Sequence, residues 1–127
     1  MLNKLYNLFG QIFEIAQYIE WNLALIVSKS NDIDATDLFE QMQDMTMGQI
    51  VGYAKKDEYF DEEDIRELEY ILDKRNYLAH HFFKNNDIVK HSHNGKFNDN
   101  KIRELQNILI RFQNYNNELS SSYDTNF

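Results

Sequence analysis

Hydrophobic residues recur every three or four positions over the first part of the chain. This spacing places them on one face of an α-helix, because the helix turns once every 3.6 residues. The pattern therefore predicts a long amphipathic helix over residues 2–28. Its stripe consists of Leu2, Leu5, Phe9, Ile12, Ala16, Ile19, Leu23 and Val27.

Turn and capping signals divide the region that follows. The polar residues at 28–37 predict a turn and then the start of a short helix. Farther along, a capping-box spacing predicts another helix start or a kink, and two lysines suit the C-terminus of that helix. The residues that carry these signals are Asp34 and Asp37, Thr46 and Gln49, and Lys55 and Lys56.

A third main helix is predicted over residues 61–83. Asp61 can cap its N-terminus, and acidic residues follow at the positive end of the helix dipole. The polar residues at 84–96 predict a loop, and a last helix is predicted over 99–119. The stripe of the third helix runs through Ile65, Leu68, Leu72, Arg75, Ala79 and Phe83.

These elements predict an all-α fold, an up-and-down bundle of four to five helices. The absence of proline and the presence of only four glycines support this fold class. We expect a single domain over residues 1–119 and a flexible C-terminal tail over 120–127.

Composition narrows the possible environments and chemistries. The chain has no cysteine, which excludes disulfides and thiolate metal sites. Its most apolar run, residues 23–27, is far shorter than the roughly 20 residues that span a membrane. Glu14 and Glu20 interrupt the apolar part of the N-terminus, unlike a signal peptide. We therefore expect a cytoplasmic protein with no membrane partner, no cofactor and no metal.

Charge is unevenly distributed along the chain. The net charge is −8, and an acidic surface repels the phosphates of nucleic acids. Residues 32–73, however, contain 14 acidic and 3 basic residues, whereas residues 74–111 contain 8 basic and 3 acidic ones. All four histidines also fall in the second span. A local basic cleft on an acidic body is therefore possible, although an uneven solvated surface would give the same pattern.

Arg75 occupies a position on the stripe that is expected to face the core. A buried guanidinium needs an anion or a cleft. Asn76 and His80 are four residues apart and share a helix face, while His80 lies about 140° around the axis from Arg75. Arginine can hold phosphate oxygens, and histidine can move a proton near neutral pH.

These residues can also be explained without catalysis. Arg75 could pair with an acidic side chain such as Asp37 or Asp44, and His80 could be a core histidine with satisfied hydrogen bonds.

The segment "RNYLAHHFF", which begins at Arg75, resembles the signature of the HEPN superfamily. These proteins are small helical bundles with an Arg-X4-6-His motif late in the third long helix. Arg75, Asn76 and His80 match that motif, and the similarity in helix order and length extends over nearly the whole chain.

The resemblance implies a metal-independent endoribonuclease that acts as a toxin or an antiphage-defence effector. It further implies a homodimer with both motif copies in one cleft, and an antitoxin or another regulatory protein as a partner. Arg75 would bind the scissile phosphate, His80 would act as general base or acid, and Asn76 would orient them. The 2′-OH of RNA would attack the adjacent phosphate. We expect further RNA contacts from Lys74, His81, Lys84, His91 and His93.

One position departs from the family pattern. Toxins paired with a nucleotidyltransferase antitoxin usually carry a tyrosine two residues after the histidine, as the nucleotide acceptor. This chain has Phe82 there, which lacks a hydroxyl, although Tyr77 is nearby in sequence.

Two alternatives remain open at this level. The chain could be a non-catalytic helical binding module that pairs with a toxin, an antitoxin or a phage protein through its acidic residues 57–73. The loop histidines His91 and His93 could bind a metal, but their spacing alone is weak evidence for such a site.

Overall fold

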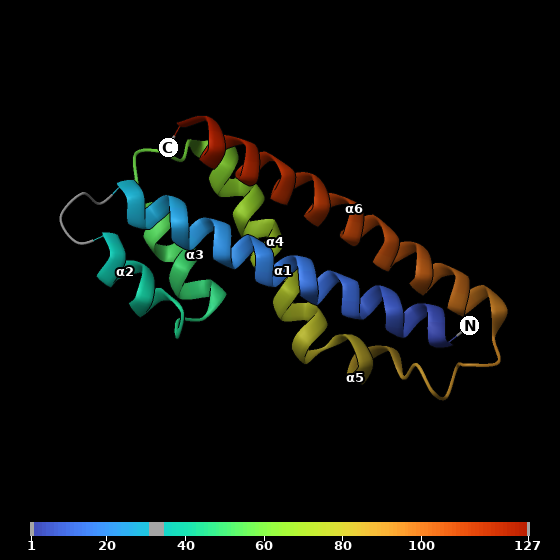
Figure 1. The fold of residues 1–127 in the computed structure, drawn as a ribbon. Helices are drawn as coiled ribbons and strands as arrows, with labels where there is room; N and C mark the ends of the chain where they lie inside the picture. Colours follow the sequence, from blue (N-terminus) through green and yellow to red (C-terminus); the bar gives the residue numbers. More distant parts are fainter. Residues whose placement is uncertain (1, 31–34, 127) are drawn as a thin grey trace.

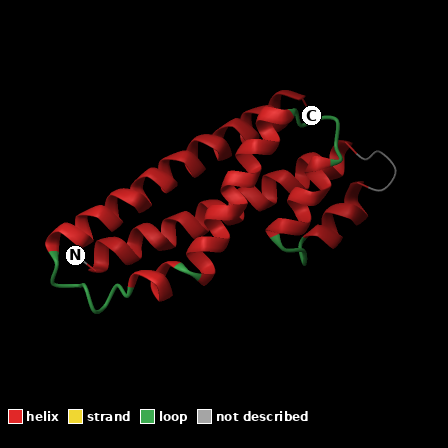
Figure 2. Cartoon of the chain, turned by 180° about the vertical axis from the view of Figure 1, so that it is seen from behind, coloured by secondary structure: helices red, strands yellow, loops and turns green. Residues whose placement is uncertain are grey.

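The computed structural model describes residues 2–30 and 35–126 (Figure 1). This part of the chain forms helices joined by turns and contains no strand (Figure 2), so the all-α prediction is confirmed. Six helices are present among the described residues: α1 (Leu2–Ser30), α2 (Ala35–Met42), α3 (Met47–Lys55), α4 (Glu62–His80), α5 (Phe82–Asn86) and α6 (Gly95–Asn126). The helix start predicted at Asp34 lies outside the described residues.

The first and last helices form the long axis of the molecule. α1 and α6 lie side by side and run in the same direction (Figure 1). Asn22 of α1 fixes their register, because its Nδ2 donates to Asn116 Oδ1 at 2.8 Å and to Ser120 Oγ at 3.1 Å. α4 runs in the opposite direction against both helices, and α2 and α3 pack against α1.

Three boundaries differ from the sequence prediction. The predicted helix over 61–83 is divided, because α4 ends at His80 and α5 begins at Phe82. The junction residue His81 has φ −128° and ψ −23°, away from helical geometry. α5 extends into the predicted loop and ends at Asn86, and the C-cap residue Asp87 that follows has a left-handed φ of 46°. α6 starts at Gly95 and continues to Asn126, so the backbone of the expected flexible tail is helical up to that residue.

The predicted helix caps in the middle of the chain are confirmed. Thr46 and Gln49 form a capping box at the start of α3, with the Gln49 amide donating to Thr46 Oγ1 at 3.3 Å. Asp61 caps α4, where it accepts from the Asp64 amide at 2.8 Å, and the Asp64 carboxylate accepts from the Asp61 amide at 3.2 Å. Such caps satisfy amides that the first helical turn leaves without partners.

The hydrophobic core lies between α1, α4 and α6, and it is completed by α3 and α5. On α4 and α5, the fully buried stripe is Leu68, Ile71, Leu78 and Phe82. The predicted stripe through Leu72, Ala79 and Phe83 is therefore wrong over its second half, since those side chains are partly or fully exposed. Arg75 lies on both stripes, four residues after Ile71.

None of the described helices combines the length and apolar character needed to cross a membrane.

Candidate functional site

Arg75 lies in the C-terminal half of α4 and is partly buried. Its charge acts on Glu20 of α1. The acidic residue near Arg75 is therefore Glu20, and not Asp37 or Asp44, the two candidates considered from sequence. Burial raises the pKa of Glu20 above its ordinary value of 4.5, and the nearby Arg75 guanidinium opposes that rise. The arginine therefore favours the ionised form of a carboxylate whose burial disfavours that form.

Most of the hydrogen-bonding capacity of Arg75 remains available. Its Nη1 donates to Asn76 Oδ1 at 3.4 Å, a long hydrogen bond. Within residues 2–30 and 35–126, this is the one hydrogen bond that the guanidinium makes. A guanidinium carries five N–H donors, so most of them can still meet an anion. Asn76 is exposed, which leaves the pair open to solvent.

His80 is the last residue of α4 and is exposed. It follows Arg75 by five residues, which on a helix corresponds to about 7.5 Å along the axis and about 140° around it. The two side chains can therefore flank a bound phosphodiester without touching each other. His81 occupies the junction with α5 and is also exposed, with its ring centroid 6.4 Å from that of His80.

The five predicted RNA-contacting residues fall into two groups. Lys74 and Lys84 lie on α4 and α5, beside the motif, together with His81. The ammonium of Lys74 is 5.8 Å from the ring centroids of both Tyr70 and Tyr77, whereas Lys84 is exposed.

His91 and His93 belong to the turns between α5 and α6, at the end of the molecule where α6 begins (Figure 1). The His91 ring lies 4.7 Å from the ring of Phe97, while His93 is exposed. Among the described residues, no hydrogen bond or ring contact links these two histidines to Arg75 or His80, and no group of three His, Asp or Glu side chains could hold a metal ion.

Aromatic side chains border the junction between α4 and α5. Phe83 contacts Phe9 and Tyr6 of α1, with ring centroids 4.8 and 5.9 Å apart, and remains 39 % exposed. Tyr6 is 44 % exposed. An apolar surface made by Tyr6, Phe9 and Phe83 therefore lies next to the exposed histidines. Phe82, in contrast, is fully buried.

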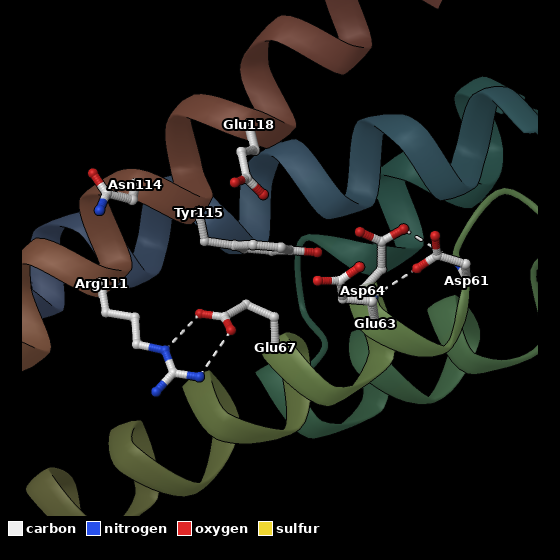
Figure 3. Close-up of a pocket in the computed structure, with 8 residues that line it drawn as sticks. All are labelled: Asp61, Glu63, Asp64, Glu67, Arg111, Asn114, Tyr115 and Glu118. Atoms are coloured by element: carbon white, nitrogen blue, oxygen red, sulfur yellow. Dashed lines mark hydrogen bonds and ion pairs between the residues drawn. The ribbon is translucent and has the colours of Figure 1, made fainter.

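A second polar site lies between α4 and α6. It is a cavity of about 410 Å³ lined by Asp61, Glu63, Asp64, Glu67, Arg111, Asn114, Tyr115 and Glu118 (Figure 3). We call it the acidic pocket.

Arg111 closes one side of the acidic pocket. Its Nε and Nη2 donate to the two carboxylate oxygens of Glu67, each at 2.9 Å. The guanidinium carbon also lies 3.5 Å from the centroid of the Tyr70 ring. Arg111 is thus engaged by a bidentate pair and by an aromatic face.

Sequence reasoning did not find the acidic pocket, although each half has a recognisable spacing. Asp64 and Glu67 are three apart on α4, and Arg111, Tyr115 and Glu118 follow an i, i+4, i+7 pattern on α6. The spacing alone could not show that these two faces meet, because that depends on the antiparallel packing of α4 against α6.

The raised pKa of Glu20 predicts how the stability of the fold depends on pH. Because the folded pKa of Glu20 is raised, the folded chain binds its proton more tightly, and the ionised form opposes folding as pH rises above about 4.5. Glu20→Gln should therefore raise the melting temperature at neutral pH, and the gain should shrink as pH falls toward 4.5. Thermal unfolding across pH 3.5–7.5 tests this, with the exposed Glu40→Gln as control. A gain of equal size in both variants would contradict it.

Comparisons of this chain with protein-family models, with curated proteins and with solved structures find no match.

Proposed function

We propose that this protein is a metal-independent endoribonuclease whose site is formed by Arg75, Asn76 and His80. The observation that carries the proposal is the state of Arg75. It is held partly buried on α4, and among the described residues its guanidinium makes one long hydrogen bond, to Asn76, which leaves most of its donors unused. The same helix ends at an exposed histidine. A cation with free donors beside an exposed imidazole suits a phosphodiester.

The proposed reaction is a transesterification within the RNA. His80 takes the proton from a 2′-OH, and the resulting oxygen attacks the adjacent phosphorus. The bond from phosphorus to the 5′-oxygen breaks, and that oxygen receives a proton from an imidazolium. The products are a 2′,3′-cyclic phosphate and a 5′-hydroxyl. Arg75 stabilises the added negative charge in the transition state, and Asn76 holds the guanidinium in position.

Two copies of the chain complete the site in this proposal. In a homodimer, one His80 serves as the base and the partner copy supplies the acid. The aromatic surface of Tyr6, Phe9 and Phe83 lies beside the motif and offers apolar area that a second copy could cover. As in the toxins and defence effectors that the sequence resembles, a cytoplasmic antitoxin or another regulatory protein would restrain the activity.

Incubation of the purified protein with a mixed RNA pool in the presence of EDTA tests this function. We expect cuts that leave 2′,3′-cyclic phosphate ends. A chimeric oligonucleotide with a 2′-deoxy residue at the mapped cleavage position should resist cleavage, because it lacks the nucleophile. Absence of cuts from folded, dimeric protein would favour the non-catalytic binding module instead.

A further inference from the structure

The acidic pocket carries an excess of negative charge that its own arginine does not balance. Five carboxylates and one guanidinium line it. Arg111 is committed to Glu67, and the Asp61 and Asp64 carboxylates each accept a backbone hydrogen bond in the cap of α4. Glu63 and Glu118 are exposed, and within the described part of the chain no hydrogen bond or ion pair engages their carboxylates.

Tyr115 gives an independent indication that something binds here. Its side chain is 3 % exposed, and its hydroxyl has no hydrogen-bond partner among the described residues. The hydroxyl points into the pocket, toward the carboxylates of Asp64 and Glu63 (Figure 3). Buried hydroxyls without partners are rare because leaving one unsatisfied costs free energy. A ligand that donates to this oxygen would remove that cost.

The pKa values of two groups in the pocket are raised above their ordinary values. Burial, and then the neighbouring Asp61 and Glu63, raise the pKa of Asp64, although a backbone hydrogen bond opposes the rise. Burial and the nearby acidic residues, Asp64 first among them, also raise the pKa of Tyr115. A positive charge bound in the pocket would oppose both shifts.

We propose that the acidic pocket binds an organic cation with several N–H donors, an alkylguanidinium or a polyamine. Tyr115 Oη would accept from its buried end, and Glu63 and Glu118 would bind it at the mouth. No three carboxylates within the described residues converge closely enough for one metal ion. Donors spread over a guanidinium or a short polyamine match this dispersed lining better than a point charge. The proposal does not depend on ribonuclease activity.

Titration calorimetry with agmatine, and separately with spermidine, tests the proposal on the full chain. We expect saturable binding that Tyr115→Phe weakens about tenfold, since a hydrogen bond to a charged group is lost. The ring and its packing remain in this variant, and the missing hydroxyl had no partner, so the melting temperature should not fall. Glu63→Gln should also weaken binding. Glu40→Gln removes the same charge from α2, outside the pocket, and should leave the affinity unchanged.

Further titrations identify the class of ligand. An acetylated, amidated Gly-Arg-Arg-Gly peptide that binds more tightly than agmatine, with the same dependence on Tyr115, would support the site and assign the cation to a protein partner. Equal weakening by Glu40→Gln and Glu63→Gln would overturn the proposal in favour of general attraction. Displacement of agmatine by an equal concentration of MgCl2 would overturn it in favour of a metal site.

Discussion

Replacing His80 by alanine is expected to lower the rate of RNA cleavage by a factor of about 100 to 10,000, the usual contribution of a general base or acid. Because His80 is exposed at the end of α4, the melting temperature should stay close to that of the wild type. Initial rates on a labelled RNA measure the effect. His81→Ala is the matched control: it removes the adjacent exposed imidazole and should cost far less activity.

Replacing Arg75 should also stop cleavage, but this change affects stability as well, because the Arg75 charge acts on Glu20. Arg75→Ala should abolish measurable cleavage and also lower stability, since it leaves a partly buried carboxylate without its cation. The double variant Glu20→Gln, Arg75→Ala should regain stability without regaining cleavage. Cleavage that persists in a folded His80→Ala or Arg75→Ala variant would end the proposed mechanism. Recovery of cleavage in the double variant would show that Arg75 serves only the fold.

Replacing Phe82 by alanine is expected to lower the free energy of unfolding by about 3–5 kcal/mol, as for other large buried aromatic residues. Its ring is fully buried, 5.9 Å from the rings of Phe9 and Tyr77, and it attaches the short helix α5 to the core. Urea denaturation followed by circular dichroism measures the loss. The neighbouring Phe83→Ala should cost much less, because that ring is 39 % exposed. Similar losses in the two variants would contradict the assignment of the core.

Phe82 stands where the toxins that the sequence resembles usually carry an acceptor tyrosine. Its ring is fully buried in the core and has no hydroxyl that could accept a nucleotide. Phe82→Tyr should destabilise by about 1–3 kcal/mol if the new hydroxyl stays buried without a partner. Tyr77 is a poor substitute as the nucleotide acceptor, because it is partly buried and its hydroxyl already accepts a hydrogen bond from Asn86 Nδ2 at 3.1 Å. Silencing by nucleotide transfer to this segment is therefore not expected.

Much of the fold could be predicted because local chemistry determines it. The capping box at Thr46, the N-cap Asp61 and the end of α3 all follow from residues within one or two turns. The face of α4 could not be settled locally. Stripes through Leu72 or through Ile71 are both apolar, and the contacts with α1 and α6 decide which one is buried.

The candidate site was predictable to a similar extent. The helix that carries Arg75 and His80 follows from the sequence, whereas the exposure of His80 does not, because a core histidine was compatible with the same pattern. The break at His81 does not, because no glycine or proline marks it. Glu20 as the acidic neighbour of Arg75, and the acidic pocket, both depend on contacts between helices distant in the chain. Helical periodicity identifies a face but not the helix that packs against it.

The pairing of α1 with α6 has a consequence for synthesis. Among the described helices, α1 has its most extensive contacts with α6, which lies far later in the chain, so the ribosome must make α6 before the core can close. Closing so large a loop slows folding relative to a bundle of sequential hairpins. Nascent chains that stop before α6 would leave the apolar face of α1 uncovered and open to chaperones and proteases. Any activity that requires the native fold would then begin only after α6 has been translated.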